Sequence, residues 1–326
     1  GIVVFITFLG GLWRGIALME MFMTAIALAV AAIPEGLPAV VTIVLALGVT
    51  RMSKRQAVIR RMPAVETLGV ATYICSDKTG TLTKNEMTVT DLYLSGSSIR
   101  VTGTGYEPVG DFLLAEKEKI KPSDNQDLEL MLIGGTLNTD ARLISRDQEF
   151  QIIGDPTEGA LVVAAQKGGI EKPIIEEKYP RLAEISFDST RKMMTTFHQF
   201  PEGFYSFTKG APDVVLARCQ YLHREGNLKE LTEEDLRELT FVNSRFASQG
   251  RRVLALAYRG WLQLPEEFDE EKVESQLVFL GYFVMMDPPR PEAKNAVALS
   301  RAAGIQPVMI TGDHQDTALK IAWELK

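Results

Sequence analysis

Apolar positions are concentrated near the start of the chain. From Met21 to Val49 every residue is apolar, small or hydroxyl-bearing except Glu35. A helix of this length, at about 1.5 Å per residue, is longer than the roughly 30 Å hydrocarbon core of a bilayer. The pattern therefore predicts a membrane-spanning segment with room for a non-helical stretch. Residues 1–11 are predicted to end a preceding span.

This apolar segment is interrupted at residues 34–38, which read PEGLP. Proline lacks an amide hydrogen and clashes with the preceding turn, so the two prolines should release backbone carbonyls from the helix. Released oxygens beside the Glu35 carboxylate would suit a hard cation at membrane depth. A proline-kinked helix whose Glu35 pairs with a neighbour fits the same pattern. The carbonyls expected to join Glu35 belong to Val30, Ala31 and Ile33.

Charges on the two sides of this segment predict its orientation. Basic residues crowd the carboxyl side, whereas Glu20 is the nearest charge on the other side. The positive-inside rule places the carboxyl side in the cytosol. Residues 48–67 are predicted to continue as a stiff, basic, amphipathic element. The basic residues are Arg51, Lys54, Arg55, Arg60 and Arg61.

The next apolar run, residues 70–75, ends in the sequence CSDKTGTLT. Asp77 thus stands at the carboxyl end of a predicted strand, where parallel α/β sheets place their chemistry. A carboxylate there can accept a phosphoryl group and form an acyl phosphate, while Lys78, a hydroxyl and the Gly80 amide offset the transferred charge. The alternative is a strand-to-loop turn in which Asp77 only caps a helix.

Beyond residue 90 the chain changes to shorter strand-like runs separated by glycine, serine and proline, so we place a domain boundary there. A helix is predicted over residues 157–167, because Asp155 and Pro156 form a good helix start. A second helix is predicted over residues 232–249, whose acidic first turn suits the helix dipole.

Several residues of this region could hold a purine nucleotide. Phe187 offers a ring face, Glu158 could meet a polar edge, and nearby cations could bind phosphates. A phenylalanine at a strand end is more often part of a core, and a Lys-Gly pair is usually a turn. The argument therefore rests on their occurrence together. The cations are Arg191, Lys192, Lys209 and Arg252.

A strand, helix, strand pattern follows, typical of a parallel sheet. The first strand, residues 277–286, ends at Asp287, and the second, residues 307–310, ends at Thr311, Gly312 and Asp313. We expect Thr311 to reach the same mouth as Asp77 and to donate to a phosphate oxygen. Asp287 would orient a hinge or a metal-bound water. The TGD sequence could also be a simple helix cap.

The composition of the chain argues against some classes of function. A net charge of -7 and a pI near 5.3 argue against a general nucleic-acid binder. Only Cys75 and Cys219 are present, so a disulfide framework or a zinc site is not expected. Both ends of the chain look cut, and we expect a piece of a longer protein.

Five motifs together resemble those of P-type cation-transporting ATPases: AVAAIPEGLPAVVT, CSDKTGTLTKNEMTV, KGAPD, MDPPRPE and MITGDH. The first of them is most similar to the calcium-pump branch of that family. The resemblance implies an α/β, haloacid dehalogenase-like parallel-sheet phosphorylation domain, incomplete here, with an inserted α+β nucleotide-binding domain and an N-terminal transmembrane segment. The expected domains are residues 1–50 (membrane), 51–90 (stalk and first part of the phosphorylation domain), 91–284 (nucleotide-binding domain) and 285–326 (second part of the phosphorylation domain).

The resemblance also implies roles for individual residues. Asp77 would be phosphorylated from Mg-ATP, and Thr79 would supply a backbone ligand to Mg²⁺. Half of a Ca²⁺ site would be formed by Glu35 and the backbone carbonyls of Val30, Ala31 and Ile33. The positions expected around the phosphate are Lys78, Thr311, Gly312 and Asp313. Those expected around the nucleotide are Glu158, Phe187, Lys192, Lys209, Gly210, Arg252, Asp287 and Arg290.

The chain departs from the family at Ser189, where calcium pumps of the endoplasmic reticulum have an arginine, so one phosphate contact is in doubt. The actuator domain, the distal magnesium motif and the later spans are also missing, and this chain alone should not complete a transport cycle. The complete protein is expected to be embedded in a lipid bilayer, with its phosphorylation and nucleotide-binding domains in the cytosol.

Three other readings remain open. The pump could carry Mn²⁺, Na⁺ or H⁺, because one carboxylate and three carbonyls do not set selectivity. A phosphatase of the haloacid dehalogenase type shares the sheet, but that class usually has an acid where Thr79 stands. A nucleotide-binding regulatory module without turnover would also fit the fragment.

Overall fold

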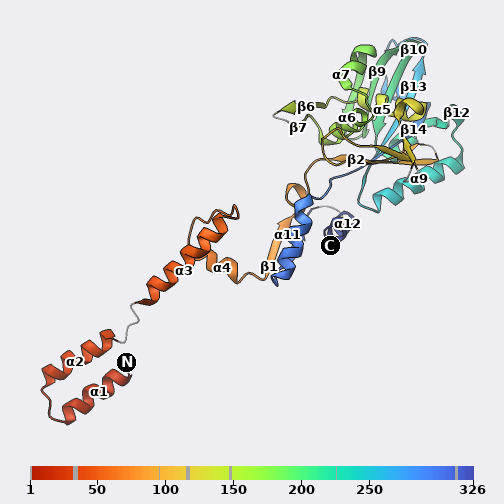
Figure 1. Ribbon diagram of the computed structural model, residues 1–326. Coiled ribbons are helices and arrows are strands. Elements are labelled where there is room, and N and C mark those ends of the chain that lie inside the picture. The colour runs from red at the N-terminus through yellow and green to blue at the C-terminus, as the bar shows by residue number, and fades with distance from the viewer. Residues whose placement is uncertain are drawn as a thin grey trace. The chain divides into compact units, whose positions relative to one another are not determined.

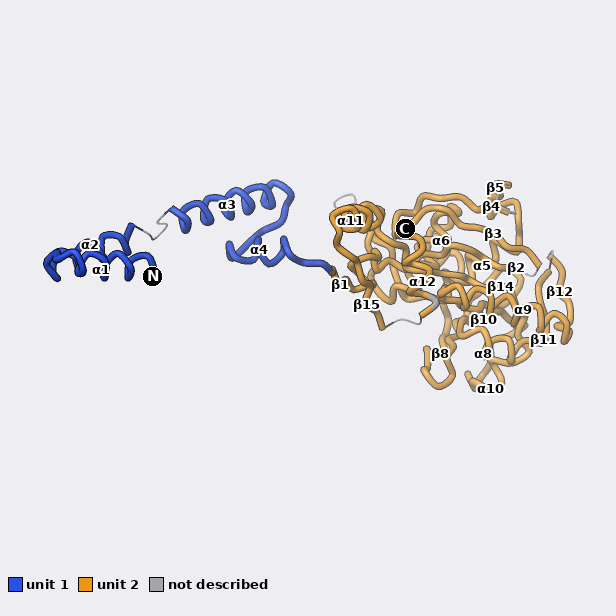
Figure 2. The backbone as a smooth tube through the Cα atoms, turned by 90° about the horizontal axis from the view of Figure 1, so that it is seen from below, with its two compact units in different colours: residues 1–72 blue, residues 73–326 orange. Residues whose placement is uncertain are grey.

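The computed structural model describes residues 2–31, 36–94, 96–114, 118–146, 149–224, 226–312 and 315–326. The chain divides into two compact units, Gly1–Thr72 and Tyr73–Lys326, coloured separately in Figure 2.

The first unit is helical, with α1 (Ile2–Trp13), α2 (Leu18–Ala31), α3 (Gly36–Ser53) and α4 (Pro63–Gly69). Most of its apolar side chains are exposed. The stretch Leu18–Ser53 is long and apolar enough to cross a membrane by length and composition. Val30 and Ala31 end α2, whereas Ile33 and Glu35 lie outside the described residues.

The predicted continuous element over residues 48–67 is wrong. Helix α3 ends at Ser53, and Gln56 adopts a left-handed φ of 63°. Helix α4 then begins at Pro63, a residue that suits the first helical turn because its missing amide hydrogen is not needed there. This part of the chain is therefore two helices joined by an irregular segment.

The second unit contains a small parallel sheet made of β1 (Tyr73–Asp77) and β15 (Gln306–Ile310). Its register sets Asp77 opposite Ile310, as expected for two parallel strands that end at one edge. Helices α11 (Pro291–Ala302) and α12 (Gln315–Glu324) accompany these strands. Ala293 of α11 and Ile321 of α12 belong to their shared core.

Among the described residues, the rest of the unit is built on an 11-stranded, largely antiparallel sheet (Figure 1). Its main path runs β5-β4-β3-β2-β14-β13-β10-β9-β8, and β11 joins it by pairing in parallel with β14. The strands are β2 (Thr88–Leu94), β3 (Ser97–Val101), β4 (Phe112–Leu114), β5 (Glu118–Ile120), β8 (Arg181–Asp188), β9 (Met193–Phe200), β10 (Gly203–Gly210), β11 (Cys219–Arg224), β12 (Asn227–Glu230), β13 (Arg252–Trp261) and β14 (Leu277–Met286).

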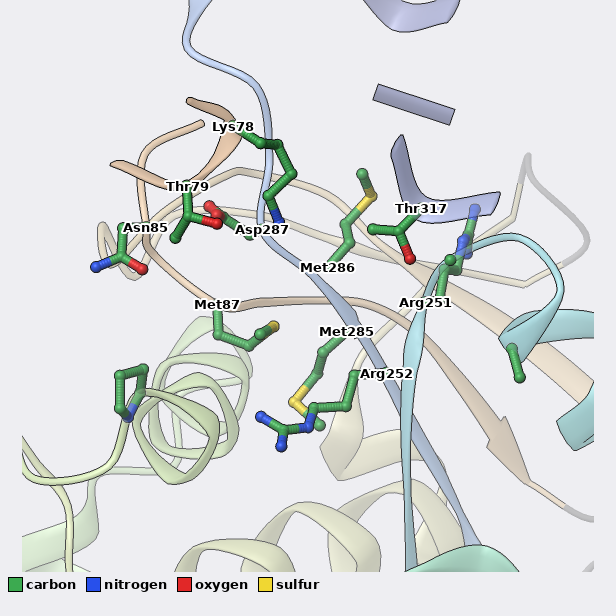
Figure 3. Close-up of a pocket in the computed structure, with 13 residues that line it drawn as sticks. Lys78, Thr79, Asn85, Met87, Arg251, Arg252, Met285, Met286, Asp287 and Thr317 are labelled. Carbon is green, nitrogen blue, oxygen red and sulfur yellow. The ribbon is translucent and has the colours of Figure 1, made fainter. Parts of the chain in front are cut away.

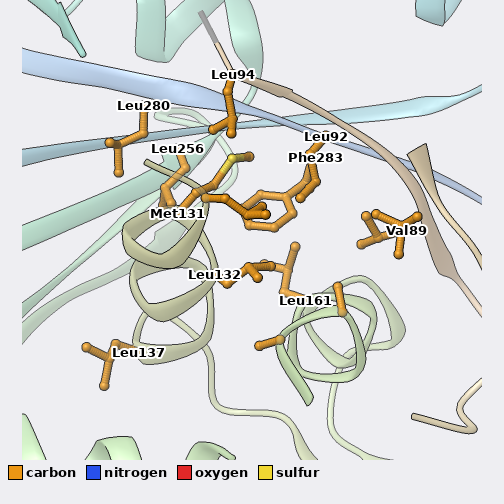
Figure 4. Close-up of a cluster of buried hydrophobic side chains, with 14 of the residues drawn as sticks. Val89, Leu92, Leu94, Met131, Leu132, Leu137, Leu161, Leu256, Leu280 and Phe283 are labelled. Atoms are coloured by element: carbon orange, nitrogen blue, oxygen red, sulfur yellow. The ribbon is translucent and has the colours of Figure 1, made fainter. Parts of the chain in front are cut away.

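Helices cover both faces of this sheet. On one face α5 (Gln126–Leu137) and α6 (Pro156–Lys167) pack against Phe283 and Leu256 (Figure 4). On the other face α8 (Pro212–Leu216) and α9 (Glu233–Ala247) cover Tyr282 and Ala255. Neighbouring residues of β13 and β14 thus enter different cores, which explains why β14 is apolar almost throughout. The smaller elements are α7 (Lys172–Lys178), α10 (Glu270–Val273), a 3₁₀ turn (Pro122–Asp124) and the hairpin β6 (Arg142–Arg146) with β7 (Glu149–Ile153).

Both predicted helix starts are confirmed. The Asp155 side chain accepts hydrogen bonds from the amides of Thr157 and Glu158 at the start of α6. Thr232 and Asp235 form a reciprocal capping box at the start of α9. Local side-chain chemistry was sufficient for these two predictions.

One strand assignment is wrong. The run 277–286 is a strand, but β14 pairs with β2 and β13 in the antiparallel sheet and not with β1. The strand after CSDKTGTLT, β2, likewise belongs to that sheet. The strand that follows the CSDKTGTLT loop, β2, and the strand that leads back toward β15, β14, are therefore neighbours in the large sheet.

Candidate functional site

The CSDKTGTLT segment forms a tight loop at the end of β1. Residues Lys78–Leu82 make a π-type turn in which Gly80 has φ of 73°, a left-handed conformation that favours glycine. The amide of Thr83 donates to the carbonyl of Lys78 at 3.0 Å and closes the turn. Asp77 is exposed at the rim of this loop, while Lys78 is buried.

The second strand end lies beside the first. Because Asp77 pairs with Ile310, Thr311 and Gly312 leave the sheet at the edge where the Lys78–Leu82 turn begins. Thr311 is half-buried and Gly312 is exposed. Asp313, predicted to act with them, lies outside the described residues. The topology therefore brings Asp77 and Thr311 to one edge from distant parts of the sequence.

Two connecting segments, residues 82–86 and 287–290, link this edge to the large sheet. The amide of Lys84 donates to the carbonyl of Pro288 at 3.1 Å. Asp287 accepts hydrogen bonds from the Thr83 hydroxyl and from the Glu86 amide, the latter at 3.3 Å. Both carboxylate oxygens of Asp287 thus engage the opposite segment, an arrangement that suits the predicted hinge role.

Arg290 also spans the two connecting segments. Its amide donates to the carbonyl of Leu82 at 2.8 Å, and its guanidinium donates to the carbonyl of Gly80 at 3.3 Å. Glu292 lies 3.9 Å from the same guanidinium. In this structure Arg290 therefore contacts the loop that follows Asp77.

The first cavity of the site, with a volume of about 460 Å³, lies between the loop and the large sheet. Lys78, Thr79 and Asp287 face it from the loop side (Figure 3). Arg251 and Arg252 line it from the start of β13 and the residue before it. The cavity thus combines hydroxyl, carboxylate and guanidinium groups close to the end of β1.

The second cavity, of about 470 Å³, lies in the inserted part of the chain. Phe187 is 63% exposed at the end of β8, so its ring is available to a ligand and is not part of the core. Apolar atoms of Val253 and Leu254 also line the cavity. The residues predicted for a nucleotide that line it are Glu158, Phe187, Lys192, Lys209, Gly210 and Arg252.

Arg252 lines both cavities and donates from its guanidinium to the Thr157 hydroxyl at 2.8 Å. Asp155 and Thr157 line the second cavity and Pro156 lines the first. The cavities therefore meet along Arg252 and the start of α6. A long ligand could place one end on Phe187 and the other near the end of β1.

Lys209 is buried at the wall of the second cavity. Its ammonium donates to Glu158 Oε1 at 2.8 Å and to Asn138 Oδ1 at 2.9 Å, and also to the Asn138 carbonyl. Burial lowers the pKa of Lys209, while the Glu158 carboxylate acts in the opposite direction. Lys209 and Glu158, both expected in the same nucleotide-binding set, thus form one ion pair.

Arg191 has a different location from the one predicted. Its guanidinium pairs with Glu274, which is fully buried, and with Glu270 at 3.3 Å. Arg191 lines another cavity with Asp188 and Glu270. Since these pairs join the guanidinium to α10 and the residue after it, and it also donates to the Ser186 carbonyl of β8 at 2.6 Å, we assign Arg191 a structural role in place of phosphate binding.

Asn138 and Arg251 are among the residues of the site that were not predicted. Asn138 contacts Lys209, and Arg251 forms an ion pair with Asp91 of β2 while lining the first cavity. Neither had a sequence signal, because Asn138 follows an apolar helix and Arg251 stands beside the already assigned Arg252. Long-range pairing alone gives them their positions.

Comparison with known proteins adds a decisive observation. The family described as "P-type ATPase, cytoplasmic domain N" matches residues 127–292, about half of the chain. The chain belongs to the P-type ATPase family.

Full-length relatives agree with this assignment. The calcium-transporting ATPase of Bacillus subtilis is 46% identical over 317 residues, covering 97% of this chain and 35% of the relative. Calcium-transporting ATPase 1 of Bacillus cereus is 44% identical over 308 residues, covering 94% and 32%. The cation-transporting ATPase pma1 of Synechocystis is 44% identical over 324 residues, covering 97% and 35%. The chain spans about a third of the length of these relatives.

The loop at the end of β1 offers oxygen atoms that suit Mg²⁺. Magnesium prefers oxygen ligands, keeps several waters and binds through one or two carboxylates plus substrate phosphates. The exposed Asp77 carboxylate and the Thr79 backbone offer such oxygens at the open loop. Among the described residues no three His, Cys, Asp or Glu side chains gather around a metal position. The donors therefore fit an ion shared with a phosphate ligand.

Proposed function

We propose that the complete protein is an ATP-driven pump that moves Ca²⁺ across a membrane through an aspartyl phosphate at Asp77. The observation that carries this proposal is the meeting of the two cavities at Arg252, one lined by Phe187 and one by Lys78 and Thr79. Membership of the P-type ATPase family supports it. Relatives named calcium-transporting ATPases support the choice of ion.

In the proposed reaction ATP lies along both cavities. The adenine stacks on Phe187, and Lys192 and Arg252 stabilise the phosphates. An Asp77 carboxylate oxygen then attacks the γ-phosphorus as the bond to the β–γ bridging oxygen breaks, which leaves ADP and an acyl phosphate. Lys78 and the Thr311 hydroxyl stabilise the oxygens of the transferring group. Gly312 and Asp313 are proposed to close on the same phosphate.

Mg²⁺, held by Asp77 and the Thr79 carbonyl, would neutralise charge on the phosphates. Asp287 and Arg290 would hold the connecting segments, consistent with their hydrogen bonds to Glu86 and Leu82. Gly210 and the Lys209–Glu158 pair would shape the nucleotide pocket.

We also propose four domains: a membrane part (residues 1–50), a stalk with the first part of the phosphorylation domain (51–90), a nucleotide-binding domain (91–284) and the second part of the phosphorylation domain (285–326). The phosphorylation domain would be haloacid dehalogenase-like. The exposed apolar side chains of Ile74 and Ile310 on the small parallel sheet support this, because further strands or helices would cover them. Both cytoplasmic domains would face the cytosol, with the actuator domain and further spans completing the pump.

The transported ion would bind at Glu35 with the carbonyls of Val30, Ala31 and Ile33. A cation other than Ca²⁺ is the second candidate, because the Synechocystis relative is named only as a cation-transporting ATPase. Calcium titration of phosphoenzyme formation in the complete protein separates the two candidates. We expect Ca²⁺ to be required and Glu35→Gln to raise the Ca²⁺ concentration needed about tenfold or more; indifference to Ca²⁺ would favour the second candidate.

Asp77 is the proposed phosphate acceptor. Asp77→Asn in the complete protein should abolish acid-stable, hydroxylamine-sensitive labelling from γ-labelled ATP, because an amide cannot form the acyl phosphate. ATP affinity should change less than threefold, since Asp77 lies at the far end of the proposed ligand path. Asp111→Asn, on the exposed ion pair with Lys119, is the matched control and should label normally. Persistent labelling of Asp77→Asn would refute the assignment.

A further inference from the structure

The turn that follows α5, residues 137–141, is held by basic side chains from other elements. Arg181 of β8 donates to the carbonyls of Leu137 at 3.1 Å and Thr139 at 2.8 Å. Lys172 of α7 donates to the same Thr139 carbonyl at 2.7 Å. Charge-assisted hydrogen bonds of this kind are stronger than neutral ones, so the turn is firmly fixed.

Glu158 fixes the same turn from its other side. Its Oε2 accepts hydrogen bonds from the amides of Asp140 at 2.8 Å and Ala141 at 3.1 Å. Its Oε1 accepts from the Lys209 ammonium at 2.8 Å. One carboxylate therefore joins the turn to the lysine that lines the second cavity.

Asn138 is fully buried within this turn. Its Nδ2 donates to the carbonyls of Met194 on β9, at 3.2 Å, and Phe207 on β10. Its Oδ1 accepts from the Lys209 ammonium at 2.9 Å. The side chain thus uses donor and acceptor groups at once, a combination that Leu and Asp of similar size lack.

We propose that Asn138 is a positioning residue for nucleotide binding, which with Glu158 holds the Lys209 ammonium at the wall of the second cavity. The inference rests on the proposed function, because it takes the ligand of this cavity to be ATP. Asn138 acts through Lys209: it fixes the direction of a long side chain that would otherwise sample several rotamers. Pre-organisation of this kind lowers the entropy lost when a ligand binds.

The inference can be tested on Lys209 without any nucleotide. The charged groups that face its ammonium are Glu158 on α6, Asp140 in the turn and Arg181 on β8. Burial lowers the pKa of Lys209. Asn138→Asp adds a negative charge beside the ammonium and should raise that pKa, whereas Asn138→Leu removes an acceptor and should lower it further.

The measurement is the pH dependence of Lys209 acetylation by acetic anhydride in the complete protein, followed by peptide mass spectrometry. The reactivity curve should move to higher pH in Asn138→Asp and to lower pH in Asn138→Leu, because only the neutral amine reacts. The matched control is Leu137→Ala, the buried neighbour, which loses core packing but leaves the Lys209 contacts in place. Its curve should coincide with that of the unmodified sequence. Unmoved curves in both Asn138 variants overturn the inference.

Nucleotide affinity supplies the second measurement. ATP binding should weaken about tenfold in Asn138→Leu and in Lys209→Met, and the double variant should be no weaker than Lys209→Met alone. Additive losses would mean that Asn138 does not act through Lys209, and the inference would fail. If Asn138→Leu does not fold, Asn138→Ser fits the same space and should shift the curve in the same direction. Failure of the unmodified protein to bind ATP would contradict the proposed function, while the acetylation curves would still decide the role of Asn138.

Discussion

At the scale of single residues, His198 on β9 is a buried group whose protonation opposes folding. Its Nδ1 lies 3.0 Å from the carbonyl of Tyr179, which can only accept, so Nδ1 carries the hydrogen. Its Nε2 lies 3.0 Å from the Thr196 hydroxyl, which can then donate to it. Burial lowers the pKa of His198 from 6.5 to about 4, and Arg181 adds to this effect.

A pH dependence of stability follows from His198. The folded-state pKa lies below the unfolded value, so the unfolded chain binds the proton more readily. The stabilisation is present above about pH 6.5 and is lost as the pH falls toward 4, by about 3 kcal/mol in all. Urea titrations at pH 7 and 4.5 should show this loss, and His198→Gln should remove most of it. An equally steep loss in that variant would contradict the assignment to His198.

Residue types alone predicted part of the lining of the second cavity. Glu158, Lys209 and Arg252 were chosen for charge, and the structure brings them to one cavity. Phe187 was ambiguous, because a strand end can face a core or solvent, and only its exposure decides between them. Arg191 was misplaced because its partner Glu274 lies on a distant segment. Distant ion pairs leave no local pattern in a sequence.

At the scale of elements, the consecutive glycines Gly134 and Gly135 let α5 pack directly against phenylalanine rings of the sheet. A Cβ on Gly135 would lie 2.6 Å from Cζ of Phe283, and one on Gly134 would lie 2.4 Å from Cδ1 of Phe207. Both rings are fully buried. Sequence periodicity could not reveal this approach, since it depends on which strands lie under the helix.

Gly135→Ala therefore has two opposing effects on the stability of the fold. Alanine favours helix by about 1 kcal/mol over glycine, whereas overpacking against Phe283 costs about 1–3 kcal/mol. We expect a net loss of about 1 kcal/mol in the free energy of unfolding, measured by urea denaturation. Gly260→Ala, where the added Cβ meets nothing within 4 Å, is the control and should not be destabilising by this route. A stabilised Gly135→Ala protein would show that the helix can move away from the sheet.

The residues at which helices begin could be predicted better than the strands with which a given strand pairs. The starts of α6 and α9 depend on side chains within a few residues, so local rules were enough. Strand β14 pairs with β2 through contacts such as Tyr282 opposite Tyr93, far away in the sequence. Because an apolar run suits either a parallel or a doubly covered antiparallel strand, its sheet could not be chosen in advance.

At the scale of the whole second unit, the chain leaves the small sheet and returns to it through two adjacent connecting segments. The Thr83 hydroxyl donates to Asp287, and the Arg290 amide donates to Leu82. Motions of the large sheet relative to Asp77 would therefore strain these hydrogen bonds. A change here should affect phosphoryl transfer more than nucleotide binding.

Thr83→Val tests this division of roles. It removes the hydroxyl that contacts Asp287 and, at 3.1 Å, the Lys78 carbonyl, and it keeps the shape of a fully buried side chain. Phosphorylation at saturating ATP should slow about tenfold, since a hydrogen bond to a charged group contributes about 1.5–3 kcal/mol, while the ATP dissociation constant should stay within about twofold. The measurement is rapid-quench phosphorylation of the complete protein beside equilibrium ATP binding.

Thr136→Val is the matched control for this experiment, because it makes the same substitution at another buried threonine. The Thr136 hydroxyl has no hydrogen-bond partner among the described residues, so both quantities should match those of the unmodified protein. Equal losses of rate and affinity in Thr83→Val would mean that the connecting segments shape the nucleotide pocket itself. A lost rate with retained affinity would assign them to the approach of the γ-phosphate to Asp77.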